Sequence, residues 1–454
     1  MSRPPNFLFF LPDQHRPDWL GINPRLPLRT PNLDALAARG TVFTRAYTPS
    51  PLCAPARACL ASARAYGQCR VLDNNQDYPL DIPTYYQRLR DRGYRVCGVG
   101  KFDLHKDLTK PLFWELDGSR LLREWGFTEG IDNEGKLDGS NSYLSAGRKP
   151  RGPYLDFLAQ RGLADLYVDE HLRRKNLGNA YVTALPDDAY CDNWLSENGL
   201  RFLRQFPEDQ PWHLVVNFTG PHAPMDVTAS MAERWRDAPI PPPHDIRRDD
   251  PEVALRRRRY YAAMIENIDR QIGRFTALVE ERGELDNTIV VFASDHGEML
   301  GDHARWGKGT WHEPSSRIPL VVAGPGVRRG ATAHALAALH DLAATFLDYA
   351  GAEPLPQADA RSLRPLLEGN TEQHRQFIYS GLYNPDLRGW DMVVEGRWKL
   401  IRTDDAFILY DLESDPQEDR DLAPEHPDVV ERLSRRFPIP RGPGAEPGPA
   451  DEHR

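Results

Sequence analysis

The chain of 454 residues is poor in cysteine and has no long apolar run. Its cysteines form an odd, sparse set without the paired spacing of metal sites: Cys53, Cys59, Cys69, Cys97 and Cys191. This pattern argues against a disulfide framework and predicts a reducing compartment. No segment approaches the roughly 18 apolar residues of a membrane span. The apolar stretch from Phe7 to Leu11 is too short for a signal peptide. We therefore expect a cytoplasmic protein without membrane contact.

Positive charge is also in deficit. The chain has 57 Lys and Arg against 66 Asp and Glu, a net charge of −9, and the two signs are well mixed. This balance argues against nucleic acid as the main partner. An anionic substrate would need individual lysines, arginines and histidines gathered in one cleft. The composition, 40% hydrophobic and 27% charged, is ordinary for a globular protein with a sizeable core.

Apolar runs alternate with helix-like segments up to about residue 350. The runs that read as buried strands are 6–11, 94–100, 212–218, 288–293 and 318–323, and the helical segments are 30–40, 54–63, 85–92, 188–206, 252–282 and 340–350. This alternation predicts an α/β domain over residues 1–370, with a doubly wound, mostly parallel sheet flanked by helices. Polar residues follow several of the strands, namely Asp13, Lys101, His222 and Asp295. We expect them to meet at the carboxyl edge of the sheet, where such sheets place ligands.

Three other segments differ from this alternating pattern in composition and periodicity. Residues 106–186 show little periodicity, so we expect an irregular region that shapes a substrate pocket or an oligomer contact. Residues 371–437 contain short strand-like runs and a final helical segment, which predicts a small antiparallel α+β domain. The Pro- and Gly-rich tail at 438–454 is expected to be disordered or to reach a partner subunit.

Cys53 opens the pattern Cys-x-Pro-x-Arg, which ends at Arg57. The following segment, 54–63, can form a helix. Residue 53 would then lie beside a helix N-terminus, where free backbone N–H groups and the helix dipole favour an anion. Taken alone, the pattern fits a buried thiol before a helix equally well.

Two further pairs of residues carry the chemistry of a metal site. Asp13 and Gln14 follow the first strand, and Asp295 and His296 follow a late one. Two carboxylates, an amide oxygen and an imidazole make a plausible site for a divalent cation, with residue 53 as a further ligand. Each pair alone would also fit a turn at the end of a strand.

Taken together, these motifs resemble the type I sulfatases of the alkaline phosphatase superfamily over nearly the whole chain. The matching pieces are Pro-Asn-Leu-Asp-Ala-Leu-Ala, Ser-Pro-Leu-Cys-Ala-Pro-Ala-Arg, Gly-Lys-Phe, Gly-Pro-His, Ser-Asp-His-Gly-Glu-Met-Leu-Gly-Asp-His and the later Lys308. Asp13-Gln14 with Asp295-His296 looks like the branch of choline sulfatases and phosphonate monoester hydrolases.

The resemblance implies that a maturation enzyme oxidises Cys53 to Cα-formylglycine, whose hydrated form is the nucleophile. It implies a divalent cation bound by Asp13, Gln14, residue 53, Asp295 and His296. Calcium is usual in sulfatases, and the imidazole makes manganese or zinc more competitive, with magnesium also possible. The resemblance further implies a homo-oligomer, which is usual in the family. It also gives catalytic roles to four residues. Arg57 would hold the nucleophile. The sulfate would be stabilised by Lys101, His222 and Lys308, and the leaving oxygen would be protonated by His222 or Lys308.

Three residues are expected to contact the substrate. Asn74 falls where this branch has a substrate-contacting asparagine. Many sulfatases read Lys-x-His after this strand, but the residue after Phe102 is Asp103, and the nearest histidine is His105. Either His105 swings in, or Asp103 contacts a cationic or hydroxylated substrate, or Asp103 is a loop carboxylate in solvent.

The sequence thus predicts a metal-assisted, formylglycine-dependent hydrolase of small-molecule sulfate esters, aryl or alkyl. The alternative is a phosphonate monoester or phosphodiester hydrolase with the same centre. A catalytically silent relative is disfavoured because Cys53, Arg57, Asp13 and Asp295 are all present. No spacing names the leaving alcohol.

Overall fold

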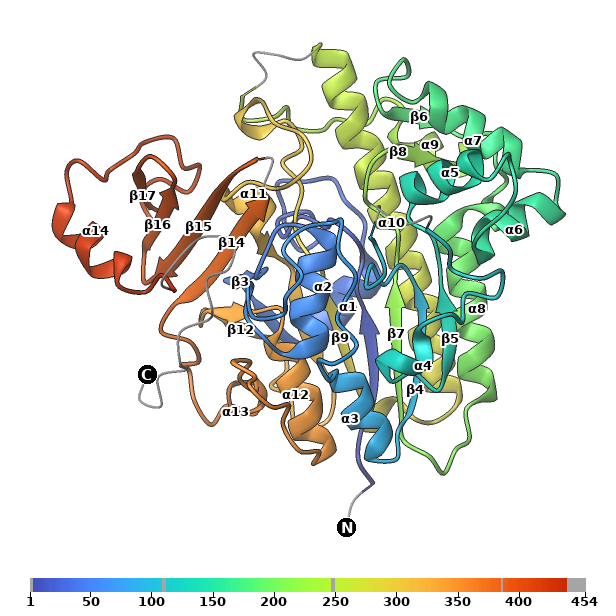
Figure 1. The fold of residues 1–454 in the computed structure, drawn as a ribbon, viewed down its shortest axis with the longest axis horizontal. Helices are drawn as coiled ribbons and strands as arrows, with labels where there is room; N and C mark the ends of the chain where they lie inside the picture. The colour runs from blue at the N-terminus through green and yellow to red at the C-terminus, as the bar shows by residue number, and fades with distance from the viewer. Residues whose placement is uncertain (1–2, 108–111, 246–249, 385–386, 439–454) are drawn as a thin grey trace.

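A mixed sheet of eight strands forms the centre of the computed structural model, which describes residues 3–107, 112–245, 250–384 and 387–438 (Figure 1). The strand order is β12-β2-β11-β9-β1-β7-β4-β5. Five neighbours run parallel: β9 (Thr288–Ala293), β1 (Asn6–Phe10), β7 (Trp212–Asn217), β4 (Arg95–Gly100) and β5 (Glu129–Asp132). β11 (Leu320–Ala323) runs antiparallel to β9 and β2 (Gly40–Phe43), and β12 (Ala331–Ala333) is parallel to β2. The predicted mostly parallel α/β sheet is confirmed.

Helices cover both faces of this sheet because the side chains of each buried strand alternate between two cores. Phe7 and Phe9 of β1 pack with α2 (Cys53–Ser62), α3 (Tyr85–Asp91) and α12 (Asp341–Ala350). Leu8 and Phe10 pack on the other face, with α1 (Pro31–Ala38), α8 (Cys191–Gln205) and α10 (Pro251–Glu281). The strand β1 is therefore apolar from Phe7 to Phe10 and fully buried.

A local side-chain cap begins α10, whereas a distant carboxylate serves the start of α1. The carboxylate of Asp250 accepts from the backbone N–H groups of Glu252 and Val253 and so begins α10, with Pro251 at its first position. Thr30 precedes α1 as expected, but its side chain does not cap that helix. The first N–H groups of α1 donate to the carboxylate of Asp269 on α10 instead.

The expectation that residues 106–186 are irregular is wrong. This stretch contains α4 (Leu122–Trp125), β5, α5 (Lys136–Ser145), α6 (Pro153–Gln160), α7 (Ala164–Arg173) and β6 (Ala180–Val182). The helices are short and weakly periodic, but their apolar side chains share one core with α8, made in part by Tyr143, Leu155, Leu158, Val168 and Leu195. Tertiary packing rather than local pattern stabilises them. Residues 108–111 lie outside the described residues.

Shorter elements complete the main sheet domain. β10 (Arg317–Ile318), β3 (Ala46–Tyr47) and β13 (Ala337–Ala338) form a small sheet, and β6 pairs in parallel with β8 (Met225–Val227). The remaining helices here are α9 (Ala229–Trp235), α11 (Glu313–Ser316) and α13 (Arg364–Leu367), besides three short 3-10 turns, Asp187–Ala189, Leu285–Asn287 and Asp302–Ala304.

The C-terminal part is a four-stranded antiparallel sheet with one helix, which confirms the predicted small α+β unit (Figure 1). Its strands are β14 (Ile378–Asn384), β15 (Leu387–Glu395), β16 (Trp398–Thr403) and β17 (Phe407–Asp411), and α14 (Pro427–Ser434) packs on it through Val429 and Leu433. The predicted tail lies outside the described residues, apart from Pro438. Over the described part of the chain, no helix combines the length and the apolarity needed to cross a bilayer.

A buried lysine ties this C-terminal sheet to the main domain. Lys399 of β16 is fully buried, and its ammonium lies 3.1 Å from a carboxylate oxygen of Glu313 and 2.7 Å from one of Glu418. Glu313 begins α11, a few residues after Lys308. This cluster therefore fixes the segment that carries Lys308 against the small sheet.

Replacing Lys399 with methionine should lower the free energy of unfolding by about 3–5 kcal/mol, because two buried carboxylates lose their counter-ion. Urea unfolding curves of the variant and the wild type measure this difference. The matched control is Arg435→Met, which removes an exposed cation paired with Glu431. That change should stay within about 0.5 kcal/mol; equal effects of the two substitutions would contradict the role given to Lys399.

Candidate active site

The site forms where two adjacent parallel strands end. β1 and β9 pair in register from Asn6 opposite Thr288 to Phe10 opposite Phe292, so the loops that follow them leave the sheet side by side. The hydroxyl of Ser294 donates to the carbonyl of Pro12 and accepts from the backbone N–H of His15. These bonds hold the loop with Asp13 against the loop with Asp295.

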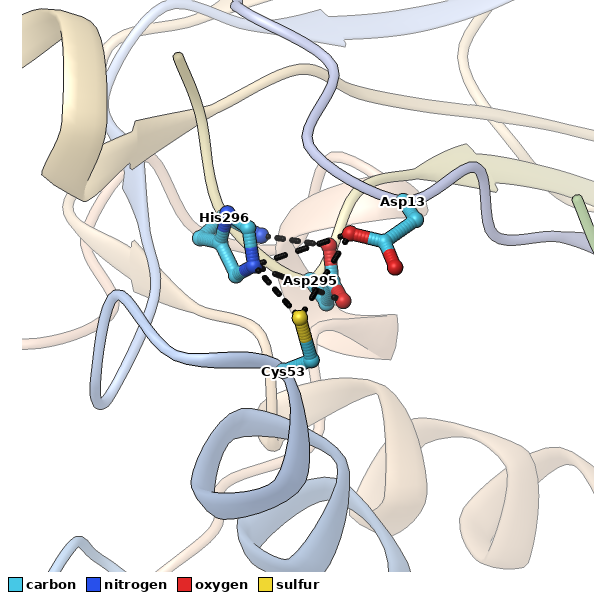
Figure 2. A group of neighbouring side chains, drawn as sticks. All are labelled: Asp13, Cys53, Asp295 and His296. Carbon is cyan, nitrogen blue, oxygen red and sulfur yellow. Dashed lines mark hydrogen bonds and ion pairs between the residues drawn. The ribbon is translucent and has the colours of Figure 1, made fainter. Parts of the chain in front are cut away.

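Four buried side chains converge there: Asp13, Cys53, Asp295 and His296 (Figure 2). One ligand atom from each lies within 4.8 Å of the others. Sγ of Cys53 is 3.3 Å from Nε2 of His296 and 3.6 Å from Oδ1 of Asp13. Nδ1 of His296 donates to the carbonyl of Gly297 at 3.0 Å, so in the neutral ring the lone pair of Nε2 faces the cluster. Such an outer hydrogen bond is typical of metal-binding histidines.

Gln14 completes a donor set suited to a divalent cation. Its backbone N–H donates to Oδ1 of Asp295 at 3.0 Å, and its side-chain Nε2 donates to the carboxylate of Glu298. This orientation leaves Oε1 buried, without a hydrogen-bond partner among the described residues. A buried amide oxygen without a donor calls for a positive partner. Two carboxylates, this oxygen and an imidazole therefore fit a cation.

Cationic side chains surround the acids. Lys101 pairs with Asp13, and the ammonium of Lys308 lies 2.8 Å from Sγ of Cys53. Burial alone would raise the pKa of Asp13, but Lys101, His222, Lys308 and Arg57 together hold it well below its usual range. Asp13 is therefore ionised and able to bind a positive charge.

The same balance acts on the thiol of Cys53. Burial and the carboxylate of Asp13 would raise its pKa, yet Lys101, Lys308 and His296 bring the pKa well below its usual range. The pocket thus favours negative charge on the side chain at position 53.

Arg57 is buried and donates to three acceptors around the site. Its Nε donates to Oδ2 of Asp295 at 2.9 Å, and Nη1 donates to the carbonyl of Lys101 and to Oδ1 of Asn217. Nη2 is buried and has no partner in the described part of the chain. The guanidinium therefore joins helix α2 to the ends of β4, β7 and β9 and keeps one nitrogen free.

Residue 53 is the first residue of α2, as the sequence predicted within one position. Oδ1 of Asn74 accepts from the backbone N–H of Ala54 at 2.9 Å, so Asn74 supplies the cap that Leu52 lacks. The side-chain nitrogen of Asn74 remains for a ligand.

A cavity of about 210 Å³ opens onto this group and brings together most of the predicted site residues. Those that line it are Asp13, Cys53, Asn74, Lys101, His222 and Lys308. His222 follows β7, and its Nδ1 donates to the carbonyl of Ala223 at 2.6 Å. Gln14, Arg57, Asp295 and His296 lie behind this surface as buried supports.

The structure does not bring His105 into the cavity. Its Nδ1 lies 3.0 Å from Asp77 and its Nε2 2.8 Å from the guanidinium of Arg120. Asp103 is not in solvent but 8% exposed, and its Oδ2 bridges Lys101 at 2.9 Å and Lys106 at 2.8 Å.

Sequence reasoning missed several residues that line or support the site. Lys106, Asn75, Thr219, Lys136 and Asp138 line the cavity, while Ser294 and Glu298 hold its loops. Lys106 and Asp138 belong to the stretch predicted to be irregular, where no periodicity marked them. Ser294 could have been singled out because it directly precedes Asp295 at the end of a strand.

This fold and site define a class. A mostly parallel α/β sheet carries, at adjacent strand ends, a buried acid and imidazole group beside a lysine-lined cavity, as in hydrolases with the alkaline phosphatase-like fold. Residues 5–352 match the family described as Sulfatase, and residues 301–438 match the N-sulphoglucosamine sulphohydrolase C-terminal family. The chain therefore belongs to the sulfatase family, as its motifs indicated, and is a sulfuric ester hydrolase.

Relatives and structures of similar fold agree with this assignment. The chain is 27% identical to the arylsulfatase of Clostridium perfringens, over 99% of this chain and 97% of that protein. It is 30% identical to the choline-sulfatase of Rhizobium meliloti, over 92% and 82%. The crystal structure of a phosphonate monoester hydrolase of Agrobacterium radiobacter has the same fold, with a TM-score of 0.77, 23% identity and coverage of 95% and 94%.

Replacing Gln14 with leucine should weaken the binding of a divalent cation at least about tenfold, because the buried oxygen ligand is lost. Equilibrium dialysis of metal-stripped protein against Ca²⁺ and Mn²⁺ measures the affinity. Gln160→Leu changes an exposed glutamine on α6 and should leave the affinity unchanged. An unchanged affinity in Gln14→Leu would remove Gln14 from the ligand set.

Proposed function

We propose that this chain hydrolyses sulfate monoesters with a formylglycine derived from Cys53 by a maturation enzyme. A divalent cation is held by Asp13, Gln14, Asp295 and His296, with residue 53 as a further ligand. The observation that carries this proposal is the position of Cys53. Its side chain touches both the acid and imidazole cluster and Lys308, at a helix N-terminus, on the wall of one cavity.

The cation, when bound, withdraws electron density from the sulfate oxygens and lowers the pKa of an attacking hydroxyl group. The hydrated formylglycine offers such a hydroxyl at residue 53. Calcium is the first candidate for the cation, and the imidazole of His296 keeps manganese and zinc as alternatives.

The side chains of this chain then divide the remaining tasks. Lys101 and Lys308 face the cavity beside residue 53 and bind the anionic ester oxygens. Arg57 holds Asp295 through its Nε. Its Nη2 is buried at the site and has no hydrogen-bond partner among the described residues. This arrangement stabilises negative charge at the sulfur centre.

His222 or Lys308 supplies the proton for the leaving oxygen. Nδ1 of His222 is held by the carbonyl of Ala223, so Nε2 carries a proton only when the ring is an imidazolium. The pair therefore gives two candidate proton donors on the same cavity wall. A cytoplasmic location and a homo-oligomeric state belong to the same proposal.

Conversion of Cys53 is the first test. Mass spectrometry of the peptide that contains residue 53, from protein coexpressed with a formylglycine-generating enzyme, should show loss of the thiol sulfur and gain of an aldehyde. A Cys53→Ala variant produced in the same way should lose at least about 10³-fold in kcat/KM on 4-nitrophenyl sulfate, because it has no nucleophile. An unmodified Cys53 in protein of full activity would sink the proposal.

Kinetics on matched esters test the substrate class. Fully converted enzyme should show a higher kcat/KM for an aryl sulfate than for the corresponding phosphonate monoester or phosphodiester. The reverse order would establish the alternative activity with the same centre.

A further inference from the structure

The outer wall of the active-site cavity is polar and carries a lysine–aspartate pair. Lys106 and Asp138 line the cavity together with Asn75 and Leu137. Nζ of Lys106 lies 3.0 Å from Oδ2 of Asp138. Oδ1 of Asp138 has no hydrogen-bond partner among the described residues, and its side chain is 19% exposed. The wall therefore offers donors and an acceptor side by side.

We propose that the leaving alcohol is polyhydroxylated and sugar-like, and that Lys106 and Asp138 bind its hydroxyl groups. This inference rests on the proposed sulfatase activity and names its substrate class. A hydroxyl group donates to one partner and accepts from another, which a carboxylate beside an ammonium group satisfies. The amide of Asn75 adds one donor and one acceptor to the same wall.

The pair is held rigidly. Lys136, two residues before Asp138, is buried, and its ammonium lies 2.5 Å from Asp226 and donates to the carbonyls of His222 and Pro224 at 3.1 Å. Helix α5 is thus fixed to the loop that carries His222, and Asp138 in its first turn is fixed with it. A preorganised polar group binds a matching hydroxyl at low entropic cost.

The pair also connects with the catalytic lysine. Oδ2 of Asp103 bridges Lys106 and Lys101. Burial would lower the pKa of Lys106, but Asp103 and Asp138 raise it, so the ammonium stays charged. The carboxylate of Asp103 therefore links Lys106, which binds the leaving group in this proposal, to Lys101, which binds the sulfate.

The same wall disfavours the other alcohols that sulfatase relatives suggest. A quaternary ammonium group is recognised by the faces of Trp, Tyr or Phe, and none of the described residues that line this cavity is one of these. Lys106 would also repel such a cation. An arene would find only the side chain of Leu137 as an apolar contact.

The test compares sulfate esters of matched shape. Glucose 6-sulfate is paired with cyclohexylmethyl sulfate and glucose 3-sulfate with cyclohexyl sulfate; choline sulfate and 4-nitrophenyl sulfate complete the set. A site built for hydroxyl groups rejects analogues that lack them by large factors, so the better glucose sulfate should exceed its hydrocarbon partner at least about 10³-fold in kcat/KM. Equal or faster turnover of the hydrocarbon esters or of choline sulfate would overturn the inference.

Two variants assign the preference to the pair. Asp138→Asn and Lys106→Met should each reduce the ratio of glucose sulfate to hydrocarbon sulfate turnover at least about tenfold. A proportional loss on all esters would give the pair a structural role only and overturn the inference. Asp156→Asn, in the first turn of the neighbouring helix α6, is the matched control and should leave the ratio unchanged. Failure of fully converted enzyme to hydrolyse any of these sulfate esters would instead refute the proposed function itself.

Discussion

The burial of two carboxylates at neighbouring strand ends is the constraint on which this structure depends. Asp13 and Asp295 are both fully buried within the same group of ligand atoms. Two charges of one sign in a medium of low polarity repel strongly and must be compensated. The positive groups Lys101, Lys308 and Arg57 supply part of that compensation. A divalent cation between the acids would supply more, and the resulting excess of positive charge would suit an anionic sulfate ester at the cavity wall.

Arg57 contributes to the site differently from Lys101 and Lys308. Arg57 bonds three acceptors with a planar fork and is almost fully buried, so it acts as a brace between helix α2 and the sheet. Lys101 and Lys308 each place a compact charge on the cavity wall. The guanidinium holds the helix that begins at residue 53 against Asp295, and the two lysines place their charges beside the cavity.

The sequence predicted the features that have strong local patterns. Apolar runs followed by polar residues located β1, β4, β7 and β9, and parallel pairing implied that Asp13 and Asp295 meet. It did not predict the helices between residues 122 and 173, because their stability comes from a shared core that no single segment reveals. The placement of His105 and the cap role of Asn74 also depend on distant partners, which local spacing cannot specify.

Chemistry and selectivity consequently come from different parts of the chain. Asp13, Lys101 and Asp295 follow the ends of central strands, whose fully buried side chains leave little freedom for substitution without loss of packing. Lys106 and Asp138 lie on a loop and a peripheral helix that pack on one edge of the sheet. In the mechanism proposed here, the groups that act on the sulfate therefore belong mainly to the central sheet, and those that select the leaving alcohol lie at its periphery.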